Sequence, residues 1–102
     1  MKTHELKCWP NHFEAIARGE KTAELRKDDR GFSVGDQIVL AEWDPATYLL
    51  PPHAVKGYTG RKFGPLEITH ILEGERWGLI SGNVMLSFQG MPELTEQKRS
   101  EG

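Results

Sequence analysis

Polar and apolar positions alternate along several short stretches of this chain, and this period of two is typical of β-strands. We expect a first strand over 4–8, in which Leu6 and Cys8 share one face and Lys7 lies on the polar face. This strand ends before Pro10, because the residue before a proline is restricted in its backbone conformation. Its alternation predicts one buried face and one solvated face.

Later strands are expected over 37–43, 61–72 and 83–88. The first of these carries apolar residues on both faces, which predicts a central strand covered on each side. The second is interrupted at Gly64-Pro65, where a bulge or an edge position is expected because proline cannot donate to a ladder. The third places apolar residues on a single face of the sheet.

A short helix is expected between the first strand and Gly19. Phe13 and Ile16 lie at helical spacing, and Asn11 with Glu14 three residues later has the spacing of a capping box. A helix of about two turns is not stable alone in water, so Phe13 and Ile16 must dock it onto the sheet. Gly19 can adopt the left-handed conformation that ends a helix, which predicts an abrupt turn there.

The segment directly after this turn concentrates charge. On a strand, Ala23 and Leu25 are expected to face the core, and Lys21 would share their direction. The opposite, outward face would then hold Thr22, Glu24 and Arg26. Lys21 can join the two charged residues only if it lies at the mouth of the core or if the strand begins irregularly, and the sequence leaves both open.

Composition limits the function classes. The chain has 102 residues, 37% hydrophobic and 27% charged, which is typical of one globular domain, here assigned to 1–90 with a polar tail over 91–102. Its net charge of −2 argues against a protein that coats duplex nucleic acid by charge alone.

No apolar run approaches the roughly 20 residues of a membrane helix. A start without an apolar leader and a single cysteine favour the cytoplasm.

The order of elements predicts the fold class. Strand, helix, strand, strand, long loop, strand, strand fits a small α+β protein, a mostly antiparallel β-barrel or sheet with one helix. The loop Asp44–Gly57 contains three prolines and no periodicity, and we expect it to fold over a site as a flap. Metal binding is not expected, since the four histidines and Cys8 are scattered, and no cofactor motif is present.

The residues Gly19-x-Lys21-x-x-Glu24-x-Arg26 match the G-x-K-x-x-E-x-R signature of ASCH domains, a branch of the PUA-like superfamily. The chain also resembles a group of uncharacterised bacterial and phage ASCH-like proteins in further pieces. These are His4-x-Leu6-Lys7, Pro10, Phe13, Ile16, Val34-Gly35-Asp36 and Tyr58-Thr59-Gly60-Arg61. The resemblance covers about 4–88 and implies a small β-barrel with a helix after the first strand.

What the resemblance implies is RNA binding, in a cleft lined by the charged signature residues. The expected RNA-binding residues are Lys7, Lys21, Glu24, Arg26, Trp43, Tyr58, Thr59 and Arg61. Lysine and arginine suit phosphate, while a glutamate can accept from a base amino group or a ribose hydroxyl. The segment 56–63 interleaves cations with aromatics, as single-strand binders do, although a basic hairpin with Tyr58 and Phe63 as core anchors fits equally.

Alternatives stay open. Some ASCH relatives are enzymes, a ribonuclease and an acetylcytidine amidohydrolase, and Lys21 with Glu24 would be the catalytic acid–base pair. The amidohydrolase has a threonine where this chain has Glu24, which is a departure from that pattern. A protein-interaction module using the long loop is a third reading, and Glu24 and Arg26 can also be charges on a solvated strand face. Trp43 is expected either to stack against a nucleic-acid base or to fill the end of the barrel. Trp9 and Trp77 are assigned to packing, and Asp29 and Arg30 to a turn or the cleft edge.

Overall fold

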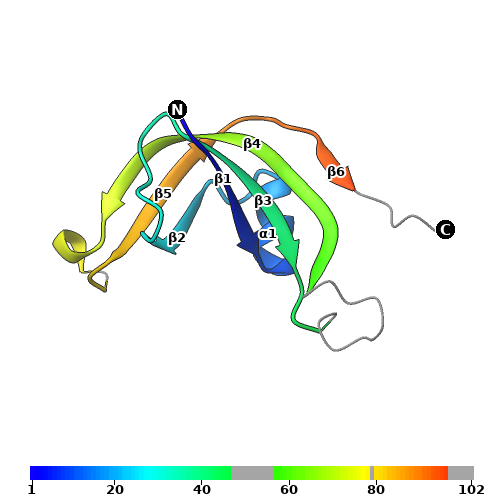
Figure 1. Ribbon diagram of the computed structural model, residues 1–102, viewed down its shortest axis with the longest axis horizontal. Helices are drawn as coiled ribbons and strands as arrows, with labels where there is room; N and C mark the ends of the chain where they lie inside the picture. Colours follow the sequence, from blue (N-terminus) through cyan, green and yellow to red (C-terminus); the bar gives the residue numbers. More distant parts are fainter. Residues whose placement is uncertain (47–56, 79, 97–102) are drawn as a thin grey trace.

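The computed structural model describes residues 1–46, 57–78 and 80–96. Its elements follow one another along the chain as in Figure 1. They are β1 (Thr3–Cys8), α1 (Pro10–Ala17), β2 (Ala23–Lys27), β3 (Gln37–Trp43), β4 (Tyr58–Glu73), the 3-10 turn η2 (Glu75–Trp77), β5 (Asn83–Gln89) and β6 (Leu94–Glu96). Residues 47–56 of the expected flap lie outside the described residues, so the flap stays a prediction.

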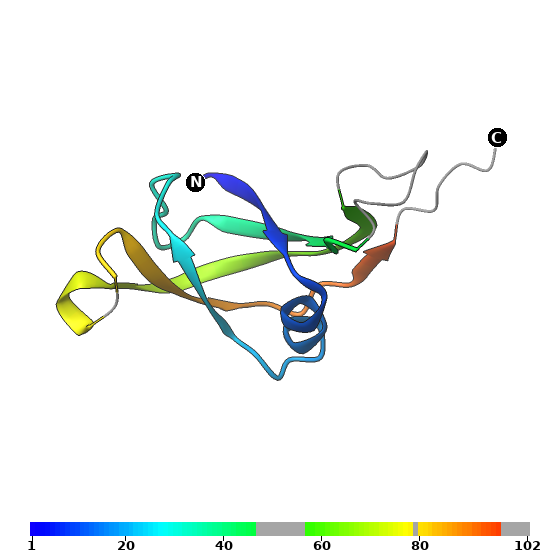
Figure 2. The same cartoon turned by 90° about the horizontal axis from the view of Figure 1, so that it is seen from below.

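The strands form one curved sheet in the order β1-β3-β4-β5-β2, with β6 added to β4. β1 pairs with β3 in parallel, and the other pairs are antiparallel. A small, mostly antiparallel α+β fold is therefore confirmed. The expected barrel is wrong, because β1 and β2 are the two edges of the sheet and form no ladder with each other. Figure 2 shows β1 leading into α1, whereas β2 runs away from the helix along the other edge.

The core lies on one face of this sheet and is closed by α1. Phe13 is fully buried and Ile16 is 3% exposed, so the two residues expected to dock the helix do so. They pack with a set of aliphatic side chains from every long strand except β2. These are Leu6, Ile38, Leu40, Leu66, Ile68, Val84 and Leu86. Burial of this set stabilises the fold by removing apolar surface from water.

The two ends of α1 differ in how well the sequence predicts them. The helix begins at Pro10 with Trp9 as N-cap, and no side chain caps it, so the expected capping box is wrong. Proline is favoured at this first position because its missing N–H would be unpaired there anyway. At the other end Gly19 has φ +78°, Gly19 N–H bonds to Ile16 O and Glu20 N–H bonds to Ala15 O. This is a Schellman ending, so the predicted stop is confirmed.

β4 is longer than expected and carries its irregularity at the predicted place. The Gly64–Pro65 peptide is cis, and the pairing of β4 with β3 shifts register there, so of the two options it is the bulge that occurs. A Cβ at Gly64 would lie 2.8 Å from Ile38 O, which explains glycine at this close approach. β6 was not expected, since Leu94–Glu96 falls in the polar tail yet pairs with β4.

Candidate functional site

β2 presents Glu24 and Arg26 on its core side. Glu24 is 7% exposed whereas Leu25 is 48% exposed, so the predicted direction of this strand is reversed. The cause is its pairing with β5, in which Glu24 stands opposite Leu86. Residues directly opposite in an antiparallel pair share a face, and Leu86 is fully buried in the core. The prediction that Glu24 and Arg26 share a face holds, but that face is the core side.

Lys21, Glu24 and Arg26 form one group, which we name the β2 charge cluster. Lys21 Nζ donates to Glu24 Oε1 at 3.1 Å and to His12 Nδ1 at 2.9 Å. Arg26 Nη1 lies 3.9 Å from Glu24 Oε2. Lys21 precedes the first residue of β2, so an irregular start of the strand is what lets it reach Glu24. Its own backbone is fixed by a bond from Lys21 N–H to Ala15 O.

One oxygen of the Glu24 carboxylate is buried without a hydrogen-bond partner among the described residues. This is Oε2, while Oε1 accepts from Lys21. A buried polar atom left unpaired costs roughly 1–3 kcal/mol, and more when the group is charged. Such an atom in a folded protein calls for an explanation, and an ordered water, an ion or a ligand can each supply the missing donor. Glu24 is therefore a candidate acceptor at the cluster.

Arg26 also connects the two edges of the sheet. Its Nη1 donates to the backbone oxygen of Lys7 on β1 at 2.8 Å. The guanidinium side chain is 24% exposed, so it stays open to solvent while it makes this bond. The β2 charge cluster is thus held against β1 as well as against α1.

A second polar group, the Glu42 network, consists of Glu14, Glu42, Thr59 and Arg61. Thr59 Oγ1 donates to Glu42 Oε1 at 2.7 Å, and Arg61 Nη1 donates to Glu14 Oε1 at 2.6 Å and lies 3.4 Å from Glu42 Oε2. Arg61 also lies over the ring of Phe13, at 5.1 Å. Both Thr59 and Arg61 were expected at the RNA cleft. Here Arg61 ties α1 to the sheet through Glu14, and Thr59 joins β4 to Glu42 on β3.

Cys8 lies between these two groups. It stands opposite Glu42 in the β1–β3 ladder and is 3% exposed. Burial, and next the negative charge of Glu24, raise the pKa of the Cys8 thiol to about 12. The negative charge of Glu42 raises this pKa further, while the positive charges of Lys21 and Arg26 lower it. Cys8 is the small buried hydrophobe expected, with an unreactive thiol.

A third group lies at the end of β1 and β3, and we name it the Trp9 platform: Lys7, Trp9 and Trp43. Lys7 Nζ lies 5.1 Å from the ring centroid of Trp43, and the Trp9 and Trp43 rings are 6.3 Å apart with planes tilted by 40°. Trp9 is 55% exposed, and Trp77 on η2 is 65% exposed, so the packing roles expected for both are wrong. Trp43 is half-buried and covers Gly57, where a Cβ would lie 2.5 Å from the indole.

The remaining expected residues have local roles. Tyr58 stands opposite Trp43 in the β3–β4 ladder and is half-buried. Asp29 and Arg30 form an exposed ion pair of 3.8 Å, in a turn that Asp28 stabilises by accepting from Gly31 N–H. The turn role is the one observed for this pair.

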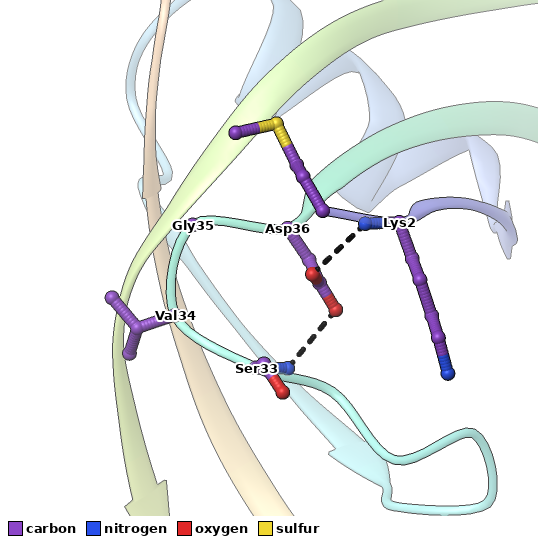
Figure 3. Close-up of a pocket in the computed structure, with 6 residues that line it drawn as sticks. Lys2, Ser33, Val34, Gly35 and Asp36 are labelled. Carbon is purple, nitrogen blue, oxygen red and sulfur yellow. Dashed lines mark hydrogen bonds between the residues drawn. The ribbon is translucent and has the colours of Figure 1, made fainter.

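Two surface hollows lie away from the expected site residues. The hollow in Figure 3 is lined by Met1, Lys2, Ser33, Val34, Gly35 and Asp36. Asp36 accepts from Lys2 N–H, Ser33 N–H and His4 Nε2, and these bonds, led by that from His4, lower its pKa to about 2. The other hollow lies at the β4–β5 turn, beside Asp28 and Glu73. Among the described residues, no three His, Cys, Asp or Glu side chains gather as metal ligands.

Sequence reasoning missed His12, Glu14 and Glu42 as parts of the site. The position of Glu42 could have been predicted from the sequence. It continues the alternate positions of Ile38 and Leu40, so on a strand it must face the core side. His12 and Glu14 carried none, because only the docking of α1 brings them to Lys21 and Arg61.

Comparison with known proteins identifies a family and a relative. Residues 3–88 match the family described as "Domain of unknown function (DUF3850)". The chain is also 35% identical over 77 residues to an "Uncharacterized 12.9 kDa protein in GpA 3'region" of Escherichia phage P2. That alignment covers 74% of this chain and 60% of the phage protein. No helix among the described residues has the length and apolar character needed to span a membrane.

Proposed function

We propose that this chain, which belongs to the DUF3850 family, binds single-stranded or structured RNA, or a nucleotide, at the β2 charge cluster. One observation carries the proposal: a buried glutamate on the core side of an edge strand lies between two cations, and its Oε2 accepts no hydrogen bond among the described residues. The resemblance of the signature residues to ASCH domains of the PUA-like superfamily supports the same ligand class.

The chemistry of the cluster fits a nucleotide. Lys21 and Arg26 are 29% and 24% exposed, so both cations can meet phosphate oxygens without leaving their places. Glu24 can accept from a base amino group or a ribose hydroxyl once its side chain turns toward the ligand, because Oε2 is buried in the free protein. The cluster carries two positive charges against one negative charge, and this excess suits an anion.

Binding of a fluorescein-labelled single-stranded RNA, followed by fluorescence anisotropy, tests the proposal. Lys21→Ala and Arg26→Ala should each weaken binding by about tenfold or more, and added salt should weaken it further because phosphate contacts release counterions. Arg76→Ala, on η2 at the far end of the sheet, is the matched control and should bind like the wild type. Unchanged affinity in both cluster variants would overturn the proposal.

A hydrolase acting at the same cluster is the second candidate function. It is favoured by Lys21 Nζ, which lies within hydrogen-bond distance of both the Glu24 carboxylate and the His12 imidazole, so a proton can pass among the three groups. Incubation with labelled single-stranded RNA and with acetylated cytidine tests it, read by strand cleavage and by acetate release. Turnover that is lost in Glu24→Gln would support the candidate, and the absence of turnover on both substrates would remove it.

A further inference from the structure

We infer that Trp9 is a stacking surface for an unpaired base, so that the ligand is a single strand that extends from the β2 charge cluster over the end of β1 onto the Trp9 platform. This inference rests on the proposed function and deepens it by naming the class of ligand. It assigns a binding role to Trp9, a residue outside the signature on which the resemblance is based.

Trp9 is held in place by its backbone while its indole is open to solvent. Trp9 O accepts from Phe13 N–H at 2.8 Å, and Trp9 is the N-cap of α1, between β1 and the helix. Its side chain makes no capping bond, so helix geometry does not explain why a tryptophan stands here. At 55% exposure, the ring presents much of its apolar surface to water. A fixed, exposed indole is suited to stacking on another ring.

The side chains beside Trp9 suit a nucleic-acid strand better than an apolar partner. Trp43 extends the aromatic surface, and Lys7 places its ammonium over the Trp43 ring. Proteins that bind single strands combine cations along the backbone with aromatic rings under successive bases. The platform has both parts, a cation for a phosphate and an exposed ring for a base.

The platform is continuous with the β2 charge cluster through β1. Arg26 bonds to the backbone oxygen of Lys7, and the Lys7 side chain lies on the platform. Trp9 follows Lys7 by two residues, directly after the end of β1. One strand can therefore place a nucleotide at Glu24 and a neighbouring base on Trp9. A duplex cannot do this, since its base faces are covered by stacking within the helix.

The test compares three probes: a ten-nucleotide single-stranded RNA of mixed sequence, the same RNA annealed to its complement, and AMP. Trp9→Ala should weaken binding of the single strand about 5- to 100-fold, the range expected for one lost stacking contact. AMP is too short to occupy the β2 charge cluster and Trp9 together, so Trp9→Ala should weaken AMP binding less than it weakens binding of the single strand. Trp9→Phe should restore most of the affinity, and the wild type should prefer the single strand over the duplex. Trp77→Ala, which removes another exposed tryptophan, is the matched control.

The outcomes separate this inference from the proposed function. If Trp9→Ala binds the single strand like Trp77→Ala while Lys21→Ala binds it weakly, the stacking role is overturned and the charge cluster keeps its role. If Lys21→Ala and Arg26→Ala also bind the single strand like the wild type, both the stacking role and the proposed function are overturned. Circular dichroism of each variant establishes that a loss of binding is not a loss of folding. A variant that unfolds is replaced by Trp9→Leu, which keeps apolar bulk without an aromatic ring, or by Lys21→Gln, and the same loss of binding is expected.

Discussion

Arg26 Nη1 donates to the backbone oxygen of Lys7 at 2.8 Å and thereby joins the two edge strands, β2 and β1, of an open sheet. Where a closed barrel would have a ladder of backbone hydrogen bonds, this chain has a charged side chain that spans from one edge to the other. The same guanidinium lies 3.9 Å from Glu24 Oε2. Arg26 therefore serves the fold and the proposed binding site together.

Replacing Arg26 by lysine should separate these two roles. Arg26→Lys keeps the positive charge but loses the planar fork that reaches Lys7 O. We expect the free energy of unfolding to fall by about 0.5–1.5 kcal/mol, the usual net contribution of one hydrogen bond, and urea unfolding measures it. Arg76→Lys is the control. An unchanged unfolding midpoint in Arg26→Lys would show that the bond between the edges contributes nothing to stability.

Two leucines test the reversed direction of β2. Leu86 is fully buried and Leu25 is 48% exposed, although both lie on paired strands. Leu86→Ala should destabilise the protein by about 2–5 kcal/mol, because it leaves a cavity in the core. Leu25→Ala should cost less than about 1 kcal/mol, as surface substitutions do. Thermal unfolding of the pair measures the difference. Equal losses of stability in Leu86→Ala and Leu25→Ala would mean that Leu25, and not Glu24, faces the core.

The Cys8 thiol should be inert in the folded protein. With its pKa raised to about 12, almost no thiolate is present at pH 8, and burial blocks access to the sulfur. We expect a thiol-specific reagent to label Cys8 only as fast as the protein opens. Rapid labelling of the native wild type would contradict the buried position.

The same shift predicts how stability depends on alkaline pH. The unfolded thiol ionises near its ordinary pKa of 9.0, whereas the folded thiol keeps its proton up to about 12. Stability should therefore fall as pH rises above about 9, and Cys8→Ser should show a smaller fall. Urea unfolding between pH 8 and pH 10.5 gives the slope.

Asp36 should contribute to stability under acid conditions. Its hydrogen bonds from His4, Lys2 and Ser33 hold its pKa near 2, below the ordinary value of 3.8. A lowered pKa means that this contribution is complete above about pH 3.8 and is lost as pH falls toward 2. Asp36→Asn should be less stable at neutral pH and should lose less between pH 4 and pH 2. Urea unfolding at each pH measures this. If the free energy of unfolding falls equally with pH in the wild type and in Asp36→Asn, Asp36 is excluded as a source of the acid dependence.

The sequence predicts what depends on local chemistry. Gly19 ends α1 because only glycine adopts its positive φ without strain, and Phe13 and Ile16 dock the helix because their spacing leaves one apolar stripe. The β3 strand is observed over Gln37–Trp43, as expected. Such features follow from a few neighbouring residues.

What the sequence does not predict depends on partners distant along the chain. Alternation shows that Glu24 and Arg26 share a face, but only pairing with β5 shows which face that is. An apolar residue at position 25 favours the wrong answer, since a leucine normally faces the core. The open edge between β1 and β2 is likewise a property of the whole sheet. In the site, His12 and Glu42 enter through the docking of α1 and the register of β3.

The solvent-facing side chain of Leu25 provides a site at which a fluorescent label can be attached. Position 25 lies between Glu24 and Arg26 in sequence but points to the opposite side of the strand, so a dye attached there would sit behind the charged residues rather than among them. A Leu25→Cys variant labelled with a maleimide fluorophore would report on events at the neighbouring carboxylate and guanidinium without obstructing them.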